Sequence, residues 1–232
     1  MTTVYIISAP SGSGKSTLVN RVRAIVPGLT FSISYTTRPP RGSEQNGTEY
    51  FFVSRPEFEE MVRKDEFLEH AEFDGNYYGT ARRFLREAQE GGQDLLLDID
   101  VQGAEQIKRK MPQAVSIFIL PPNREELESR LRERGEDSAD VIERRLATAT
   151  REIENYGKYD YILVNDHLEE STEALKSILL AERLKRSGAQ GQRSADDTAM
   201  LARAERCRLV NVRERLQPIL ASFGLAAAPS GR

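Results

Sequence analysis

Residues 4–17 read Val-Tyr-Ile-Ile-Ser-Ala-Pro-Ser-Gly-Ser-Gly-Lys-Ser-Thr, and a helical pattern begins directly afterwards at Leu18. An apolar run, a turn of small residues, Lys-Ser and a helix start together form the setting of a P-loop. Backbone N–H groups in such a turn bind phosphate, helped by the positive end of the helix dipole. The stretch therefore predicts an α/β protein that binds a nucleoside triphosphate. A Gly-Ser turn formed by chance is the alternative.

The P-loop pattern gives each of its residues an expected role. Lys15 is expected to reach the β- and γ-phosphates and to act in catalysis, and the Ser16 hydroxyl is expected to bind Mg²⁺. Ala9 stands where the pattern has its first glycine, which is tolerable if the local φ is negative. The residues expected to contact the triphosphate are Ser11, Gly12, Ser13, Gly14, Lys15, Ser16 and Thr17.

Short apolar runs alternate with helical patterns as far as residue 185. This alternation predicts a parallel sheet covered by helices on both faces. The strands are expected at 4–8, 31–34, 50–53, 95–99, 115–120 and 161–164, with extended segments at 67–73 and 76–78 around an Asp74-Gly75 turn. The helices are expected at 17–26, 56–64, 81–90, 102–110, 124–134, 139–155 and 168–185.

The composition narrows the class of protein. The 232 residues carry a net charge of −3, which argues against a chain that coats nucleic acid or an anionic membrane. One cysteine, Cys207, leaves no disulfide framework. No apolar run approaches the roughly 18 residues of a membrane helix, and the first residues do not resemble a signal peptide. We therefore expect a cytoplasmic protein that binds neither nucleic acid nor a membrane.

The composition changes after Lys185. Residues 187–192 are rich in Gly, Ser and Gln and read as a linker, residues 196–221 regain helical periodicity, and the tail 226–232 is expected to be disordered. The expected division is a domain at 1–185 and an extension at 186–232 of unknown role. The extension is expected to pack on its own core or on a partner subunit, so a homodimer is one alternative.

A second constellation lies at residues 34–53. Arg38 and Arg41 stand three residues apart in a proline-containing loop, where paired guanidinium donors suit a phosphate dianion. Tyr50 and Tyr78 are candidates to add hydroxyl donors. The alternative is a solvated basic loop paired with acidic neighbours, Glu44 and Glu49.

Residues 36–53 match the pattern T-T-R-x-x-R-x-x-E-x-x-G-x-x-Y-x-F-V at every position and resemble the signature of the guanylate kinase family. The resemblance runs from about residue 3 to about residue 185 and includes Asn-Tyr-Tyr-Gly at 76–79 and Leu-Asp-Ile-Asp at 97–100. It implies a P-loop NTPase-type sheet flanked by helices, a small GMP-binding region at about 34–81 and a helical lid at about 123–155. It also implies Mg²⁺-dependent transfer of a phosphoryl group from ATP to GMP, and to dGMP, in purine nucleotide metabolism.

The resemblance further implies roles for single residues. Those that match Ser34, Arg38, Arg41, Tyr50 and Tyr78 hold the GMP phosphate, with Glu44 beside them, and Arg38 also counts as catalytic. Those that match Glu69, Thr80 and Asp100 hold the guanine, and Thr80 departs from the serine of many members. The motif Arg130-Leu131-x-x-Arg134-Gly135 resembles the family lid: Arg134 and Arg145 are expected to be catalytic, and Arg130 and Arg134 to contact ATP.

The chemistry of guanine supports these roles independently. A carboxylate such as Glu69 accepts hydrogen bonds from the N1–H and the exocyclic amine, and the Thr80 hydroxyl donates to O6. Adenine would leave both groups poorly paired, at a cost of roughly 1–3 kcal/mol for each. A surface position is the alternative for Glu69. The lid arginines, with Arg144 beside Arg145, have an alternative too, as the solvated face of charged helices.

Asp98 closes the buried run 95–97 and resembles the acid that orients Mg²⁺, here through water. Asp100 follows two residues later and has a helix N-cap as its alternative role. For the whole chain, the alternatives are a guanylate kinase-like module that binds phosphopeptides without catalysis, and a P-loop kinase with another acceptor.

Overall fold

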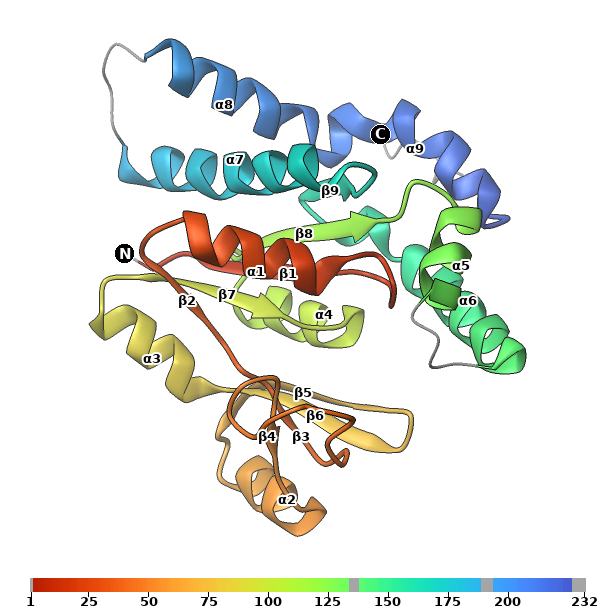
Figure 1. Cartoon of the computed structure of the whole chain (residues 1–232). Helices are drawn as coiled ribbons and strands as arrows, with labels where there is room; N and C mark the ends of the chain where they lie inside the picture. Colours follow the sequence, from red (N-terminus) through yellow and green to blue (C-terminus); the bar gives the residue numbers. More distant parts are fainter. Residues whose placement is uncertain (1, 134–137, 189–193, 227–232) are drawn as a thin grey trace. The chain divides into compact units, whose positions relative to one another are not determined.

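The computed structural model describes residues 2–133, 138–188 and 194–226 (Figure 1). The chain divides into two compact units, one of residues 1–6 and 27–115 and one of residues 7–26 and 116–232. A five-stranded sheet has the strand order β2-β7-β1-β8-β9, where β1 is Val4–Ser8, and a four-stranded sheet has the order β4-β3-β6-β5. The α/β class and the helix-flanked parallel sheet predicted from the sequence are thereby confirmed.

In the first unit, β2 (Leu29–Phe31) pairs in parallel with β7 (Asp94–Asp98). Leu95, Leu96 and Leu97 of β7 are fully buried, as expected of a strand covered on both faces. The helix α3 (Arg82–Glu90) packs on both strands through its buried face. The helix α4 (Val101–Lys110) follows β7 directly and contacts the four-stranded sheet.

The four-stranded sheet is built around a hairpin. β5 (Phe67–Phe73) and β6 (Asn76–Ala81) pair antiparallel, and Asp74 and Gly75 between them both have positive φ, as the expected turn requires. β3 (Tyr35–Thr36) pairs with β6 and with β4 (Phe51–Phe52). The helix α2 (Arg55–Arg63) begins at a capping box on Ser54.

The strand expected at 31–34 is wrong. The chain has two strands here, β2 and β3, which belong to different sheets. Residue 32 ends the pairing with β7 through a bond from its N–H to the carbonyl of Leu96, and Ser34 turns its carbonyl to Phe51 N–H of the other sheet. An apolar pattern four residues long does not show that its two ends pair with different partners.

The second unit contains α1 (Lys15–Ile25), all but the first residue of β8 (Val115–Leu120), and β9 (Tyr161–Val164). The strands β8 and β9 pair in parallel. Along the chain, β8 and β9 are separated by α5 (Arg124–Glu133), α6 (Ala139–Ile153) and a short 3₁₀ helix (Tyr156–Lys158). The helix α7 (Leu168–Ser187) packs against α1. Most predicted helices and strands begin and end within two residues of the observed ones.

The extension forms two helices, α8 (Ala195–Arg206) and α9 (Leu209–Ser222), where the periodicity at 196–221 predicted helical structure without a break. The break falls where the backbone of residues 207–209 bonds to the edge of β9. The helix α8 lies alongside α7 (Figure 1). Most of the expected linker at 187–192 and of the tail at 226–232 lies outside the described residues. In the part of the chain that is described, no helix combines the length and the apolar character needed to cross a membrane.

Candidate active site

The P-loop has the backbone that its sequence predicts. Gly12 and Gly14 have φ of +91° and +81°, a region that favours glycine, and α1 begins at Lys15 directly afterwards. Ser13 N–H donates to Pro10 O at 3.1 Å and closes the turn. A Cβ atom built at Gly14 would collide with Asn165 Nδ2, so the second glycine is needed for space as well as for conformation.

The side chains of the P-loop differ in exposure. Ser11, Ser16 and Thr17 are exposed and Lys15 is half-buried. The Ser13 hydroxyl is buried and has no hydrogen-bond partner in the described parts of the chain. Exposed hydroxyls at the start of a helix can bind an anion and its metal ion, as the sequence predicted.

The helix α5 forms a wall behind the P-loop. A Cβ atom at Gly12 would lie 2.9 Å from Leu127 Cδ1 and 3.0 Å from Leu131 Cδ2. Arg130 Nε donates to Glu126 Oε1 at 2.8 Å, and Arg130 Nη2 donates to Asn165 O at 3.1 Å. Arg130 thus contacts Asn165, which borders the P-loop, and does not lie free on a solvated helix face.

Asn165 is a contact that the sequence analysis missed. It follows β9, it is buried, and its Nδ2 donates to Ser13 O at 2.8 Å. Its backbone carbonyl accepts from Arg130 and its side-chain amide holds the P-loop, so one residue joins α5 to the phosphate-binding turn. The only available signal was an asparagine at the end of an apolar strand, which is too common to single out.

The other lid arginines lie in different surroundings. Arg145 is half-buried on α6, whereas Arg144 is exposed and its Nε donates to Asp140 O at 3.3 Å. Ile142 and Leu146 bury the opposite face of α6. Arg134 lies outside the described residues.

The residues predicted to form a phosphate clamp belong to the first unit. Arg38 is buried, with 7 % of its surface exposed, and it donates to Glu44 Oε1 at 2.9 Å and to Pro39 O at 2.8 Å. Its guanidinium lies 5.4 Å from the centre of the Tyr50 ring, and the Tyr50 and Tyr78 rings meet edge to face at 6.0 Å. The structure therefore brings Arg38, Tyr50 and Tyr78 together.

Glu44 organises this loop. Burial alone raises the pKa of its carboxyl, but the Arg38 guanidinium and the backbone N–H of Arg41, 2.7 Å from Glu44 Oε2, hold that pKa below its ordinary value. The loop is thus paired with Glu44, as the alternative interpretation expected, yet Arg38 is buried and not solvated. Arg41 is exposed, and Ser34 is half-buried beside β4.

Glu69 lies on β5 directly opposite Thr80 of β6 and has only 4 % of its surface exposed, so the surface alternative is wrong. Burial raises the pKa of Glu69 to about 7; Thr80 and Lys110 oppose this rise, and the carboxyl of Asp100 adds to it. The Thr80 hydroxyl is buried without a partner of normal hydrogen-bond geometry among the described residues. A buried acceptor beside an unsatisfied hydroxyl can recognise a ligand that carries both a donor edge and an acceptor.

Gly103 leaves space for the carboxyl groups of Glu69 and Asp100. A Cβ atom there would lie 2.6 Å from Glu69 Oε2 and 3.4 Å from Asp100 Oδ1. Asp100 caps α4 by accepting from Gly103 N–H at 2.8 Å, so the N-cap alternative is confirmed. The sequence analysis did not single out Gly103, because a helix glycine gives no sign of what packs against it.

The residues proposed for Mg²⁺ are hard oxygen donors. Asp98 ends β7 and is half-buried, and Ser16 is exposed at the first turn of α1. No cluster of three or more His, Cys, Asp or Glu side chains suited to a metal occurs within residues 2–133, 138–188 and 194–226. A small number of protein ligands is sufficient for Mg²⁺, because the ion usually keeps water and substrate phosphates in its coordination shell.

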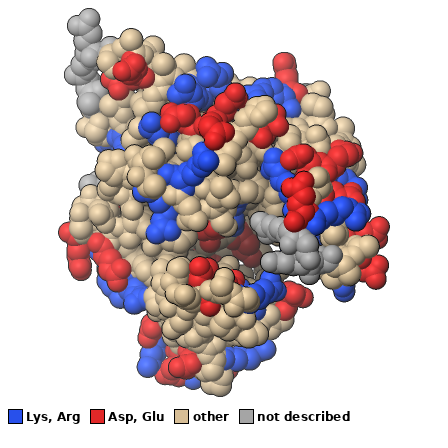
Figure 2. All heavy atoms as spheres, in the orientation of Figure 1, with Lys and Arg blue, Asp and Glu red and all other residues tan. Residues whose placement is uncertain are grey.

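Acidic and basic side chains are interspersed over the face shown in Figure 2, with no continuous basic patch in that view. This mixture agrees with the net charge of −3.

Together these features are typical of a P-loop nucleotide-binding protein, and Arg38, Glu69 and Thr80 are candidates to bind a second ligand. A sequence model of the family described as "Guanylate kinase" matches residues 1–182, and the chain belongs to this family. It is 59 % identical to a guanylate kinase of Koribacter versatilis over 230 residues, 98 % of both chains, and 49 % identical to one of Escherichia coli over 202 residues, 86 % of this chain and 98 % of the other. The crystal structure of guanylate kinase from Anaplasma phagocytophilum aligns with a TM-score of 0.67 at 36 % identity, over 79 % of this chain and 87 % of that one.

Proposed function

We propose that this protein transfers the γ-phosphoryl group of ATP to GMP, and also to dGMP, and so takes part in purine nucleotide metabolism. The observation that carries the proposal is the buried Glu69 carboxylate opposite the unsatisfied Thr80 hydroxyl, because this pair matches the donor edge and O6 of guanine. Membership of the family and the intact P-loop support catalysis over the phosphopeptide-binding alternative.

The acceptor is bound by residues of the first unit. Glu69 accepts from the N1–H and the amine of guanine, Thr80 donates to O6, and Asp100 lies beside them. The phosphate is held by Ser34, Arg38, Arg41, Tyr50 and Tyr78, while Glu44 keeps the Arg38 guanidinium in place.

The donor is bound by residues of the second unit. The backbone of residues 11–14 and the side chains of Lys15, Ser16 and Thr17 hold the phosphates of ATP. Arg130, Arg134 and Arg145 close on the donor and stabilise the charge that develops on the equatorial oxygens. The lid at 123–155 is proposed to close over the donor and exclude water.

In the reaction, an oxygen of the GMP phosphate forms a bond to the γ-phosphorus as the bond from that phosphorus to the β–γ bridging oxygen breaks. The leaving oxygen keeps the electron pair, and the products are ADP and GDP. The attacking oxygen is already anionic, so no general base is needed. The chain's contribution is to hold two polyanions in line and to offset their repulsion with Lys15, Arg38 and the lid arginines.

Ser16 and Asp98 are the residues that would hold Mg²⁺, Asp98 through water. The ion supplies charge neutralisation on the β- and γ-phosphates. The two side chains provide oxygen ligands, one at a helix start and one at a strand end. Two protein ligands are enough for Mg²⁺, because water and substrate phosphates usually fill the rest of its coordination shell. A cytoplasmic location, a homodimer and a division into 1–185 and 186–232 stay predictions.

The test is an ADP-release assay with GMP, dGMP, AMP, CMP and UMP as acceptors. We expect turnover with GMP and dGMP, and rates for AMP lower by about a hundredfold or more, since two hydrogen-bonding groups would be mismatched. Absence of turnover with all five would contradict the proposal and favour the binding module. Faster turnover with another nucleotide would reassign the acceptor.

The pH dependence of GMP binding tests the state of Glu69. With its pKa raised to about 7, Glu69 is protonated below that pH and accepts the guanine donors poorly. We expect KM for GMP to rise about tenfold between about pH 8 and about pH 6, because the ionised fraction falls by that factor. The Glu69→Gln variant should lose this part of the profile and keep only the titration of the phosphate. An identical profile in both proteins would contradict the assignment.

Substitution of Gly103 tests the space around Glu69. Gly103→Ala places a methyl group against Glu69 Oε2 and should raise KM for GMP about tenfold while KM for ATP stays constant, because a misplaced contact is costly at a binding site. Gly157→Ala is the matched control, since no heavy atom of the described residues, apart from Gly157 and its chain neighbours, lies within 4 Å of its Cβ position. An unchanged KM for GMP in Gly103→Ala would contradict the proposal that Glu69 binds the guanine base.

A further inference from the structure

The extension at 186–232 lies beyond the family match at 1–182 and is anchored to the rest of the second unit at two places. The first lies at the turn between α8 and α9. Ile162 N–H donates to Cys207 O at 2.8 Å and Leu209 N–H donates to Asp160 O at 3.1 Å, so this turn pairs with the edge of β9. The paired backbone fixes where α9 starts.

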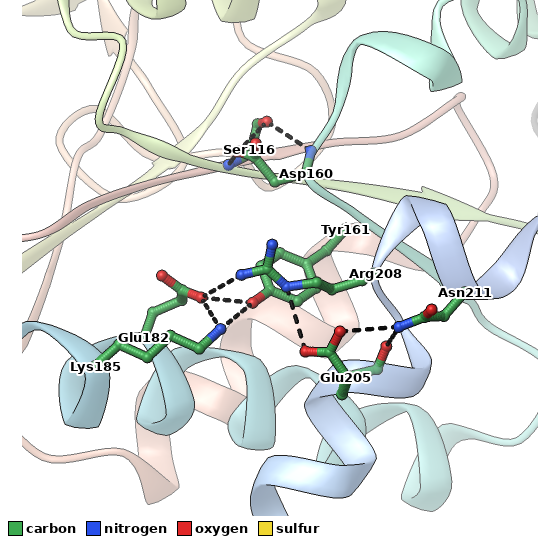
Figure 3. A network of polar contacts seen from close by, with 8 residues as sticks. All are labelled: Ser116, Asp160, Tyr161, Glu182, Lys185, Glu205, Arg208 and Asn211. Carbon is green, nitrogen blue, oxygen red and sulfur yellow. Dashed lines mark hydrogen bonds and ion pairs between the residues drawn. The ribbon is translucent and has the colours of Figure 1, made fainter. Parts of the chain in front are cut away.

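Side chains reinforce this first anchor (Figure 3). Arg208 Nη2 lies 3.4 Å from Glu182 Oε1, and its guanidinium stacks 5.1 Å from the centre of the Tyr161 ring. The Tyr161 hydroxyl donates to Glu182 Oε1 at 2.5 Å, and Lys185 Nζ donates to the same oxygen at 2.8 Å. This half-buried network joins β9, α7 and the start of α9. It therefore stabilises the anchor more than an exposed ion pair would.

The second anchor lies at the far end of α9, against the start of α5. Ser222 Oγ accepts a hydrogen bond from Arg124 N–H at 3.0 Å. Asn123 Oδ1 accepts from Glu126 N–H at 2.7 Å. A helix start has unpaired N–H groups, and here a residue of the extension pairs with one of them while a local residue pairs with another. Buried Leu216, Ile219 and Leu220 attach α9 to the rest of the unit.

The helix held in this way is the wall of the P-loop. Leu127 and Leu131 of α5 lie against Gly12, and Arg130 of the same helix bonds to Asn165, which holds Ser13 O. A displacement of α5 would therefore reach the phosphate-binding turn through two routes, apolar contact and hydrogen bonds. The extension contacts the first residue of α5, and the P-loop lies against residues further along the same helix.

We infer that the C-terminal extension positions the ATP-binding half of the protein, and that Ser222 is a positioning residue that acts through α5. The inference rests on the proposed function in one respect only, that the P-loop binds the phosphates of ATP. The relative from Koribacter versatilis, matched over 98 % of this chain, is matched across the extension as well. The extension is thus part of the donor site's support and not an inert appendage.

The test measures ADP binding by calorimetric titration in the absence of GMP, together with KM for both substrates. Ser222→Ala should weaken ADP binding and raise KM for ATP by about three- to tenfold, the factor for one lost hydrogen bond, with KM for GMP unchanged. Ser222→Thr retains the hydroxyl and should restore both values. Asn123→Ala removes the other cap of α5 and should act in the same direction as Ser222→Ala.

Ser194→Ala is the matched control, because Ser194 caps α8 in the same extension by accepting from Asp197 N–H at 3.0 Å and has no role at α5. It should lower thermal stability to a similar extent and leave ADP binding at the wild-type value. ADP binding at the wild-type value in Ser222→Ala, or equal weakening in Ser194→Ala, would overturn the inference. If the wild type itself binds no ADP, the proposed function fails instead, so the two failures are distinguishable.

Discussion

Lys15→Ala is expected to lower kcat by about a thousandfold, equivalent to about 4 kcal/mol of lost transition-state stabilisation, while the dissociation constant for GMP stays within about twofold. Lys15 stands at the first position of α1, directly after the positive-φ Gly14. In the proposed function its ammonium group binds the phosphates of the donor and not those of the acceptor. Single-turnover rates and GMP titrations measure the two quantities separately.

Arg21→Ala is the control for this experiment. Arg21 lies on the same helix and pairs with the exposed Glu169 at 3.1 Å, an ion pair whose loss should cost well under about 1 kcal/mol. Its kcat should equal that of the wild type. Normal turnover in Lys15→Ala would remove the assigned role, and an equal loss in Arg21→Ala would show that the effect comes from the charge of the helix as a whole.

Glu69→Gln is expected to lower kcat/KM for GMP by about a hundredfold or more and to leave the slow reaction with AMP nearly unchanged. The carboxylate accepts two hydrogen bonds from guanine, whereas a carboxamide turns one acceptor into a donor that faces the guanine amine. The ratio of kcat/KM for the two acceptors measures the effect. An unchanged ratio would mean that the base is recognised elsewhere.

The same substitution should stabilise the free protein in alkaline buffer. Glu69 has a folded-state pKa of about 7, raised from 4.5, so the folded chain binds more protons than the unfolded chain between these values. Its contribution to stability is full below the unfolded pKa and is lost as the pH rises through about 7. At about pH 8, we expect Glu69→Gln to gain about 1–3 kcal/mol of unfolding free energy.

Thermal unfolding scans from about pH 5 to about pH 8 check this prediction. The melting temperature of the wild type should fall relative to Glu69→Gln as the pH rises, by several degrees for a chain of this size. A constant difference between the two proteins would contradict it. Because the same carboxylate is expected to bind guanine and to destabilise the free protein, GMP should stabilise the wild type more than the variant.

Local sequence determined much of this protein. The positive φ at Gly12 and Gly14, the helix start at Lys15 and the buried strand before Asp98 follow from glycine geometry and from continuous apolar runs, which act over a few neighbouring residues. The signature at 36–53 pointed to the family that the comparisons confirm. Such features can be predicted from the sequence because their physical cause lies within the segment itself.

The tertiary structure alone decided which side chains share a site and in what state. Glu69 is buried opposite Thr80 and beside Gly103, Asn165 joins α5 to the P-loop, and Ser222 caps a helix that begins 98 residues earlier in the chain. The turn at Asp74-Gly75 sets the pairing of Glu69 with Thr80, but no period or spacing in the sequence indicates the burial of Glu69 or the other contacts. They arise because a folded chain must satisfy buried polar groups with whatever partner the packing brings close, and that partner is set by topology.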